Sequence, residues 1–576
     1  MESTSKKIYP SVDQPWKKHL SKRAQNLHLP EGTMFDLIYE NNKDYPNELA
    51  LKYMDIQVTF AEMWDHIEEV VKSLNALGVR EGEIITIAMP NTPEFVYLAY
   101  AINRVGAVMN IIHPLPGKEE LLGYLEEAQS RYFFMFDGTY AIIKDSLKET
   151  PVKKAIVVSP AYSLAPIKRT LYKLAKFPKL DKSMCIDWGT FLKNGKNASA
   201  HTVKKDPQKM AVISHTGGTT GEPKGVMLTD YAMNSVAYQV WQTFDLADRR
   251  QLSILVVLPP FVNYSFVNGI HEGLTMGDTL ALLPEFKPED FAEYYKQYKP
   301  NVINSIPQYC LAMLNDPKLK EMDLSELKYV VAGGEAMDAT AEAELNAFLK
   351  DHGADMQVTK GYGCTEFTSV VTFTYPEVNF LHSVGIPFPF VNVKIVDPDT
   401  NEELPCGERG ELCVTGPGLM LGYYNNPEAT DNIVKVHADG QRWLHMGDLG
   451  FVDEDGIVYI TGRIKRIIMT KGDDGNVTKM FPDRIENVVN KCEDVNASCV
   501  IGVKDDERIH YPKAYIELKD VTMDKDLVRE NILEICRKKL PNYQVPVEIE
   551  FMSELPLPRT ERGKIDYKAL DTDADL

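Results

Sequence analysis

Short apolar runs recur along the first 340 residues, and segments with helical periodicity separate most of them. One such segment, 58–78, carries an apolar stripe formed by Met63, Ile67, Val70, Val71 and Leu74. Thr59 and Glu62 stand at the positions of a capping box, so a helix is predicted directly after Thr59. The runs are rich in β-branched residues and lie at 84–89, 155–159, 210–214, 254–258, 302–306 and 329–334. Alternation of such strands with helices is typical of parallel α/β layers.

The pattern changes near residue 391, where closely spaced strands with turn residues replace the alternation. Residues 391–416 predict an antiparallel sheet or a small barrel, and the C-terminal part predicts a compact α+β unit. We therefore expect an α/β fold with a large N-terminal domain, 1–464, that includes a β-barrel-like subdomain at about 385–464. A small C-terminal domain, 465–576, completes the chain. The length of 576 residues exceeds what a single core supports, which agrees with this division.

Composition narrows the class of protein. A formal net charge of -20 disfavours generic binding to nucleic acid, which is itself a polyanion. The first 20 residues contain no apolar core of a signal peptide, and the longest apolar run, 254–262, is too short to span a membrane. The 8 cysteines match no zinc or redox spacing, so reduced thiols are expected. These features indicate a cytoplasmic enzyme without a transmembrane segment.

One segment departs from the acidic balance of the chain. Residues 164–179 combine an apolar helical face with basic neighbours, namely Ile167, Leu171 and Leu174 among Lys168, Arg169, Lys173 and Lys176. A helix that lies on a membrane surface is one interpretation, and a solvated helix on the flank of a domain is the other.

The stretch SHTGGTTGEPKG, at 214–225, follows an apolar strand and has very little side-chain bulk. Glycine lets backbone N–H groups approach an anion closely, and threonine hydroxyls add donors, so such a loop suits a phosphate group. Lys224 would neutralise the phosphate charge. The spacing does not match a Walker A motif, and for the loop taken alone a purely structural turn is the alternative.

The loop resembles the phosphate loop of the AMP-forming adenylating enzymes, the superfamily of acyl-CoA synthetases, firefly luciferases and peptide-synthetase adenylation domains. Position 217 is Gly where that family usually has Ser. Further segments match its motifs in the same order: VAGGEAM (331–337), KGYGCTE (360–366), RWLHMGDLGFVDEDG (442–456), TGRIKRII (461–468) and LPLPRTERGKID (555–566). The match runs from about residue 30 to the end and is most like bacterial fatty acyl-CoA synthetases.

The resemblance implies roles for individual residues. Lys564 would be catalytic, Thr365 would donate to the α-phosphate, Glu366 would hold Mg²⁺ and Lys465 would be the hinge. ATP would contact Thr216, Gly217, Gly218, Thr219, Thr220, Gly221, Lys224, Gly334, Glu335, Tyr362, Gly363, Asp448 and Arg463. The acid and CoA would contact Val262, Asn263, Tyr264, Gly333, Gly361 and Lys471.

The implied reaction has two steps, with rotation of the small domain between them. A carboxylic acid and ATP give an acyl-adenylate and pyrophosphate, and CoA then releases AMP. Besides Gly217, three further departures from the family pattern stand out: Val262 follows Phe261 where a histidine is common, Met446 replaces a threonine, and extra polar residues follow Gly472. The segment around Tyr264 has no charged residue to grip an amino acid, so an apolar acid is expected, either a medium- or long-chain fatty acid or an aryl acid.

Other interpretations stay open at this point. The acyl group could pass to an acyl carrier protein in trans instead of CoA, and the chain could form a homodimer. An inactive nucleotide-binding regulator is a third interpretation, against which stand Lys224, Glu366, Asp448, Arg463 and Lys564. A luciferase-like oxygenase is a fourth, since a fold does not determine its chemistry.

Overall fold

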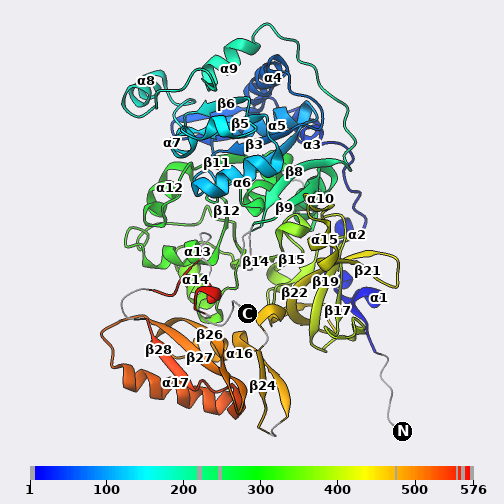
Figure 1. Ribbon diagram of the computed structural model, residues 1–576, viewed down its shortest axis with the longest axis vertical. Helices are drawn as coiled ribbons and strands as arrows, with labels where there is room; N and C mark the ends of the chain where they lie inside the picture. The colour runs from blue at the N-terminus through cyan, green and yellow to red at the C-terminus, as the bar shows by residue number, and fades with distance from the viewer. Residues whose placement is uncertain are drawn as a thin grey trace.

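The computed structural model describes residues 7–216, 223–243, 250–466, 468–473, 476–552, 556–559 and 565–570. The molecule is elongated, with a large N-terminal part above and the C-terminal domain below (Figure 1). The predicted α/β class, with a large domain followed by a small one, is confirmed. The boundary at 464/465 stays a prediction.

The first large sheet has 8 strands in the order β20-β9-β8-β4-β3-β5-β6-β7. Its strands from β7 to β8 pair in parallel, whereas β8 and β9 form an antiparallel hairpin that β20 extends. The bounds are β3 Ile84–Ala88, β4 Val108–Ile111, β5 Tyr132–Phe136, β6 Lys154–Val158, β7 Cys185–Asp187, β8 Met210–His215, β9 Gly225–Thr229 and β20 Gly422–Tyr423.

The second large sheet has 9 strands in the order β16-β15-β14-β13-β12-β10-β11-β1-β2. Its bounds are β1 Leu49–Tyr53, β2 Ile56–Thr59, β10 Ser253–Val256, β11 Thr279–Leu282, β12 Val302–Ser305, β13 Tyr329–Gly333, β14 Thr359–Tyr362, β15 Thr372–Phe373 and β16 Ile386–Pro387. All the strands predicted from β-branched runs therefore exist, three in each large sheet, and each has at least one parallel neighbour.

Helices pack against these two sheets. The helix predicted after Thr59 is α4, Phe60–Leu77, and its capping box is complete: Thr59 Oγ1 accepts from the Glu62 N–H and the Glu62 carboxylate accepts from the Thr59 N–H. Its apolar stripe is buried, as periodicity predicts. The other helices of this part include α3 Met34–Asn42, α5 Pro93–Arg104, α6 Lys118–Ala128, α7 Asp137–Ile143, α8 Pro166–Ala175, α9 Trp188–Gly195, α10 Asp230–Thr243, α11 Glu272–Met276, α12 Phe291–Tyr298, α13 Pro307–Asn315 and α14 Ala339–Asp351.

The β-rich part forms a sheet of 6 antiparallel strands rather than a layer of parallel ones. Its elements are β17 Asn392–Val396, β18 Glu403–Leu404, β19 Gly410–Thr415, α15 Pro427–Ile433, β21 Val434–Val436, β22 Arg442–Val452 and β23 Val458–Arg463. The C-terminal part has its own apolar core, which contains Met480, Ile485, Ile516 and Ile532. It consists of β24 Ile468–Lys471, β25 Val477–Met480, α16 Pro482–Val489, β26 Val495–Asp505, β27 Ile509–Leu518, α17 Lys525–Lys539 and β28 Glu548–Phe551.

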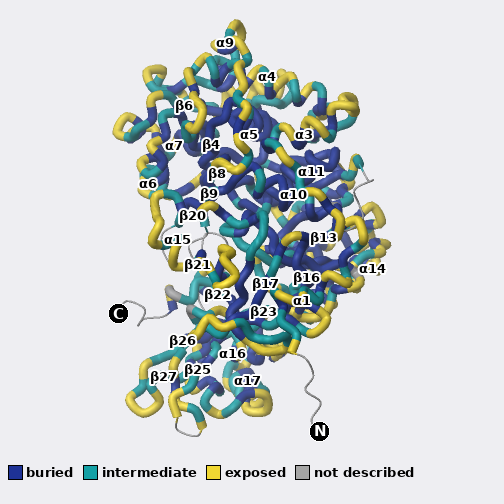
Figure 2. The backbone as a smooth tube through the Cα atoms, turned by 90° about the vertical axis from the view of Figure 1, so that its right-hand side faces the viewer, coloured by how far each residue is buried: buried dark blue, intermediate teal, exposed yellow. Residues whose placement is uncertain are grey.

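Burial follows the sheets: the buried backbone runs through the centre of the large domain, and exposed segments lie on its outside (Figure 2). Within the described part of the chain, no helix has both the length and the apolar character needed to cross a membrane.

One buried histidine connects helices that lie against both large sheets. His271 is fully buried, its Nδ1 lies 3.0 Å from the Tyr100 hydroxyl, and its Nε2 lies 2.8 Å from Asn234 Oδ1. Burial lowers the pKa of His271 to about 3. The imidazole is therefore neutral in the folded protein at neutral pH.

We expect acid to destabilise the folded protein partly through His271. The unfolded chain takes up this proton below a pKa of about 6.5, whereas the folded protein does not, so stability falls as pH falls from 6.5 towards 3. Between pH 7 and pH 4.5 the wild type should lose about 2–3 kcal/mol more than His271→Gln, which cannot titrate. Urea unfolding at both pH values measures the difference, and equal losses for the two proteins would show that His271 does not contribute.

Candidate active site

The two ends of the glycine-threonine loop are tied together at the tip of the β8–β9 hairpin. The Thr216 N–H donates to the Lys224 carbonyl at 3.1 Å, and the Lys224 N–H donates to Thr216 Oγ1 at 3.1 Å. Gly217, Gly218, Thr219, Thr220 and Gly221 lie outside the described residues. The loop closes an antiparallel hairpin, which explains why no helix follows it directly.

Strand β20 brings a tyrosine to this hairpin that sequence reasoning missed. Tyr423 pairs with Val226 across β20 and β9, and the Lys224 ammonium lies 5.2 Å from the centre of the Tyr423 ring. The Tyr423 hydroxyl donates to Glu366 Oε1 at 2.6 Å. Burial and the Glu366 carboxylate raise the pKa of Tyr423. The only signal for Tyr423 in the sequence was its position in segment 410–430. This segment fits the family pattern, but no functional residue was recognised in it.

A buried carboxylate lies at the centre of a second cluster. Asp448 Oδ2 accepts from the Tyr362 hydroxyl at 2.5 Å, and Asp448 Oδ1 contacts Arg463 Nε at 2.7 Å. Asp448 and Arg463 face each other across β22 and β23, so the sheet register sets their contact. Burial and Asp448 together raise the pKa of Tyr362 well above its usual value. The structure thus joins three residues that the resemblance assigned separately to ATP.

The methionine that replaces a threonine has a specific neighbour. Met446 Sδ lies 3.7 Å from Cys364 Sγ, and the Met446 carbonyl accepts from Arg463 Nη1 at 3.5 Å. Burial raises the pKa of Cys364 well above its usual value, so this thiol is protonated. The Met446 thioether supplies no hydroxyl donor in place of the usual threonine. Residue 446 contacts Arg463 through its backbone carbonyl and not through its side chain.

A strained turn holds Thr365 and Glu366 in place. The short helix Thr365–Phe367 ends at Thr368, whose φ of 64° is unusual for a β-branched residue. Two hydrogen bonds hold this conformation: Thr368 Oγ1 donates to the Gly418 carbonyl at 2.8 Å, and Asn263 Nδ2 donates to the Thr368 carbonyl. Gly363 is needed just before the turn, because a Cβ there would lie 1.9 Å from the Ser369 carbonyl oxygen.

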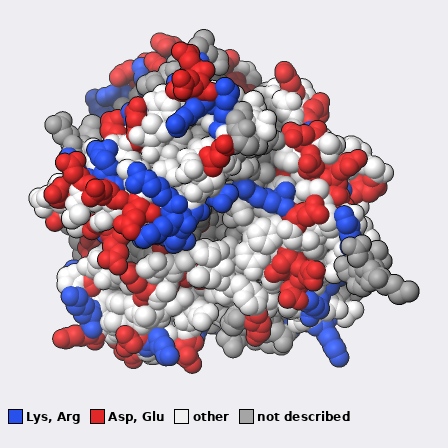
Figure 3. Space-filling model, turned by 90° about the horizontal axis from the view of Figure 1, so that it is seen from below, with Lys and Arg blue, Asp and Glu red and all other residues white. Residues whose placement is uncertain are grey.

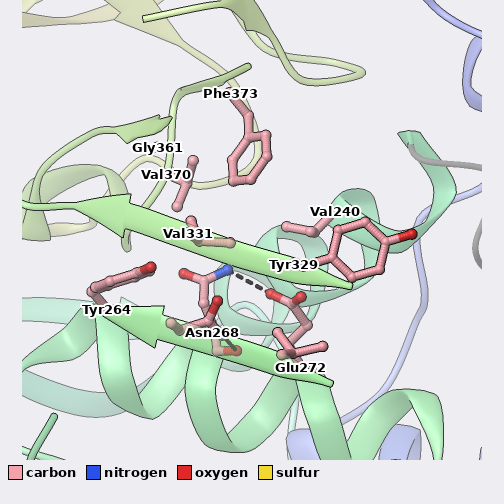
Figure 4. A pocket seen from close by; sticks show the side chains of 11 residues that line it. Val240, Tyr264, Asn268, Glu272, Tyr329, Val331, Gly361, Val370 and Phe373 are labelled. Carbon is pink, nitrogen blue, oxygen red and sulfur yellow. Dashed lines mark hydrogen bonds between the residues drawn. The ribbon is translucent and has the colours of Figure 1, made fainter. Parts of the chain in front are cut away.

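A small cavity of about 40 Å³ lies beside β12, β13 and β14 (Figure 4). Of the residues predicted to contact the acid or CoA, Tyr264 and Gly361 line it, whereas Val262 and Asn263 do not. Asn263 instead supports the Thr368 turn. Gly333 packs behind the cavity, since a Cβ there would lie 3.4 Å from the Tyr264 ring. The remaining lining residues are Val240, Asn268, Glu272, Val302, Asn304, Tyr329, Val331, Val370 and Phe373.

The cavity contains a polar pair that the sequence analysis did not anticipate. Asn268 Nδ2 donates to Glu272 Oε2 at 2.7 Å, and Asn268 Oδ1 accepts from Ser369 Oγ at 2.6 Å (Figure 4). A π-helical segment, Ser265–His271, continues into α11 and brings Asn268 and Glu272 together. Burial raises the pKa of Glu272 well above its usual value. The segment around Tyr264 has no charged residue, as noted from the sequence, and Glu272 lies just beyond it.

Gly334 and Glu335 follow β13 at the edge of the same region. Gly334 has a φ of 83°, a left-handed conformation that favours glycine. Glu335 is half-buried in the loop that leads to α14.

The junction with the C-terminal domain is held by charged groups on α16. Asp483 Oδ2 accepts from the Arg463 N–H at 3.0 Å, and Asp483 Oδ1 contacts Arg466 Nη1 at 2.6 Å. Arg466 Nη2 also contacts Glu486 Oε1 at 2.6 Å. Lys465 lies between the two arginines in the short helix Ile464–Arg466. Lys564 lies outside the described residues.

The extra polar residues after Gly472 fall between β24 and β25, which pair as an antiparallel hairpin, and residues 474–475 lie outside the described residues. The Gly472 N–H donates to the Asn476 carbonyl at 2.8 Å. The Asp473 carboxylate accepts from the Asn542 and Tyr543 N–H groups at 3.1 and 3.0 Å, which ties this hairpin to the rest of the C-terminal domain. Lys471 is exposed at the end of β24.

Comparison with known proteins agrees with this geometry. Residues 38–424 match the family model described as AMP-binding enzyme, and residues 484–564 match that of the AMP-binding enzyme C-terminal domain. A probable 4-coumarate–CoA ligase 1 of Dictyostelium discoideum is 28% identical over 537 residues, which cover 91% of this chain and 92% of the relative. A long-chain-fatty-acid–CoA ligase of Bacillus subtilis is 28% identical over 555 residues, 94% of each chain.

Solved structures share the fold. ATP-bound MatB from Rhodopseudomonas palustris has a TM-score of 0.77 at 22% identity, over 93% of this chain and 98% of that one. The anthranilate CoA ligase AuaEII in complex with anthranoyl-AMP has a TM-score of 0.76 at 22% identity, over 95% and 98% of the two chains. Since the family model covers well over half of the sequence, the motif-based prediction is confirmed: this chain is an enzyme of the AMP-binding family.

Proposed function

We propose that this enzyme activates a carboxylic acid with ATP to an acyl-adenylate, releases pyrophosphate, and then transfers the acyl group to CoA with release of AMP. The observation that carries the proposal is the convergence of residues from distant parts of the chain. Lys224 and Glu366 meet around Tyr423, while Tyr362 and Arg463 meet at Asp448. A cation beside a phosphate loop and a buried carboxylate near a tyrosine suit the phosphate and ribose ends of one nucleotide.

The proposed division of work among these residues follows from their charges. Lys224 would neutralise charge on the outgoing phosphates, and backbone donors of the loop need no reorganisation as charge moves. Asp448 would accept from ribose hydroxyls while Arg463 and Tyr362 hold its orientation. Glu366 is an oxygen ligand of the kind that Mg²⁺ prefers, and the ion when bound would neutralise phosphate charge. Its second carboxylate oxygen is the one to serve as ligand, since Oε1 accepts from Tyr423.

Pyrophosphate exchange across a panel of carboxylic acids tests this function. We expect exchange with at least one acid, and a thioester product when CoA is added. Absence of exchange with every acid would favour an inactive nucleotide-binding regulator. Exchange without a thioester from CoA, but with transfer to an acyl carrier protein, would favour the carrier-dependent reaction.

Two observations bear on the acid. Most lining residues of the cavity are apolar, which supports an apolar chain such as the expected fatty acid. The buried Asn268–Glu272 pair supports a compact aryl acid that carries a hydrogen-bonding group. We favour the aryl acid, because a polar substituent on its ring offers this buried pair a hydrogen-bonding partner, whereas an alkyl chain does not.

Glu272→Leu is expected to lower kcat/KM for a hydroxylated aryl acid by about 10- to 100-fold, through loss of a buried hydrogen-bond partner. The same substitution should leave the unsubstituted acid within about threefold. Glu272→Gln keeps the shape and the hydrogen-bonding capacity and serves as the matched control. Pyrophosphate exchange with both acids measures the ratio, and an equal loss for the two acids would remove Glu272 from substrate selection.

A further inference from the structure

Helix α8, Pro166–Ala175, is attached to the protein in an unusual orientation. None of its residues is buried. Its apolar residues are among the most exposed large hydrophobic side chains of the described chain, with 77% of Ile167, 62% of Leu171 and 81% of Leu174 accessible to solvent. A surface helix normally turns its apolar stripe towards the core, so this helix presents the reverse arrangement.

Polar side chains fasten α8 to the body of the protein. The Tyr172 hydroxyl donates to Asp137 Oδ2 at 2.9 Å, and the Arg169 guanidinium stacks over the Tyr162 ring at 5.4 Å. Lys168 forms an ion pair with Asp55 at 3.1 Å. These three residues lie away from the stripe on the helix, whereas Ile167, Leu171 and Leu174 follow a spacing of four and three and share one face. The contacts therefore hold the apolar face outward.

The segment that carries this face is basic. Residues 164–179 contain five lysine or arginine residues and no acidic residue, in a chain whose net charge is -20. α8 lies at the end of the molecule opposite the C-terminal domain, beside α7 (Figure 1). The end that carries the C-terminal domain shows acidic and basic side chains interspersed instead (Figure 3).

We propose that α8 docks the enzyme on a bilayer surface that contains anionic lipid. Ile167, Leu171 and Leu174 enter the boundary between headgroups and acyl chains, while Lys173 and Lys179 contact the headgroups. Lys176 instead lies over the Tyr172 ring, at 5.9 Å. The net charge of -20 does not prevent this, because charges more than about 10 Å away are screened at 0.1 M salt. Docking through α8 leaves the C-terminal domain on the side away from the membrane (Figure 1).

The charge of the segment favours lipid over a second copy of this chain. In a symmetric dimer the same cations would face each other across the contact, which disfavours it. An anionic bilayer supplies both an apolar layer and the opposite charge. The inference concerns a surface distant from the adenylate site and does not depend on the proposed function.

The test is co-sedimentation of the full chain with vesicles. We expect binding to vesicles of phosphatidylcholine with one quarter phosphatidylglycerol, little binding to phosphatidylcholine alone, and release as salt rises from 0.05 to 0.5 M. Leu171→Asp with Leu174→Asp should weaken binding at least tenfold. Lys173→Gln and Lys179→Gln should each weaken it about fivefold.

Matched controls come from α17 at the other end of the molecule. Leu527 is 57% exposed, so Leu527→Asp removes a comparable leucine, and Lys538→Gln with Lys539→Gln removes comparable cations. These variants should bind vesicles as the wild type does. Because all substituted side chains are exposed, unchanged melting temperatures are expected throughout. The proposal is overturned if the wild type does not bind anionic vesicles, or if the α8 variants bind them as well as the wild type does. It is also overturned if the wild type forms a dimer in solution that Leu171→Asp dissociates.

Discussion

Lys564→Ala is expected to slow acyl-adenylate formation by about 10²- to 10³-fold, the largest effect of any single substitution proposed for the reaction. Removal of one preorganised group that stabilises transition-state charge costs about 3–4 kcal/mol, which corresponds to that range. A lysine carries a compact positive charge on a flexible stem, so a mobile domain can bring it to the α-phosphate and the carboxylate oxygen. Pyrophosphate exchange with the best acid of the panel measures the effect.

Two comparisons separate a catalytic role from a general loss of function. Lys491→Ala removes an exposed lysine from the same domain and should leave exchange unchanged. When acyl-adenylate is supplied directly, Lys564→Ala should retain transfer to CoA, because the resemblance assigns the lysine to the first step. Exchange near the wild-type rate in Lys564→Ala would contradict the assignment, and loss of both steps would indicate misfolding instead.

Lys205→Met is expected to reduce the stability of the N-terminal domain by about 3–5 kcal/mol, because it leaves a buried carboxylate without its cation. Lys205 Nζ lies 3.1 Å from Asp230 Oδ2, and both side chains are almost fully buried, at 3% and 0% exposure. Asp230 Oδ1 accepts from the Met34 N–H and from Asn103 Nδ2, so the carboxyl cannot move into solvent without loss of these bonds. Urea unfolding at pH 7 measures the difference.

The pH dependence of this variant gives an additional check. Burial already raises the pKa of Asp230 against the opposing effect of Lys205. Without the lysine the pKa rises further, so the carboxyl takes up a proton more readily and the stability loss should shrink as pH falls from 7 to 5. Lys209→Met, on an exposed residue nearby, should change little, and Asp230→Asn should restore most of the stability lost in Lys205→Met. If Lys205→Met lowers the stability at pH 7 by less than about 1 kcal/mol, the pair is not important for stability.

Local patterns predicted the elements well because the interactions that form them are local. Thr59 and Glu62 are three residues apart, and their capping box depends only on that spacing. The runs at 84–89 and 329–334 became β3 and β13, since a short β-branched segment between helices has few other ways to be buried. The motif at 360–366 predicted Tyr362 and Glu366 together, but it contained nothing about their partners.

Those partners depend on pairings between distant segments. Tyr423 reaches Glu366 because β20 adds to β9, a pairing across almost 200 residues, and Tyr362 reaches Asp448 because the second large sheet lies against the β-rich part. The cavity shows the same dependence. Glu272 looked like an ordinary acidic residue until the fold enclosed it beside Asn268.

The sequence alone thus determined the α/β architecture, the family and the order of its motifs, because periodicity and short spacings encode them directly. It also identified segment 164–179 as both basic and apolar, but it left two interpretations open: a helix on a membrane surface and a solvated helix on the flank of a domain. Only the tertiary structure decided which side of α8 faces solvent, which acidic residue lines the cavity and which tyrosine contacts Glu366. Burial and contact between residues far apart in the chain are properties of the packed fold, and periodicity within one segment does not contain them.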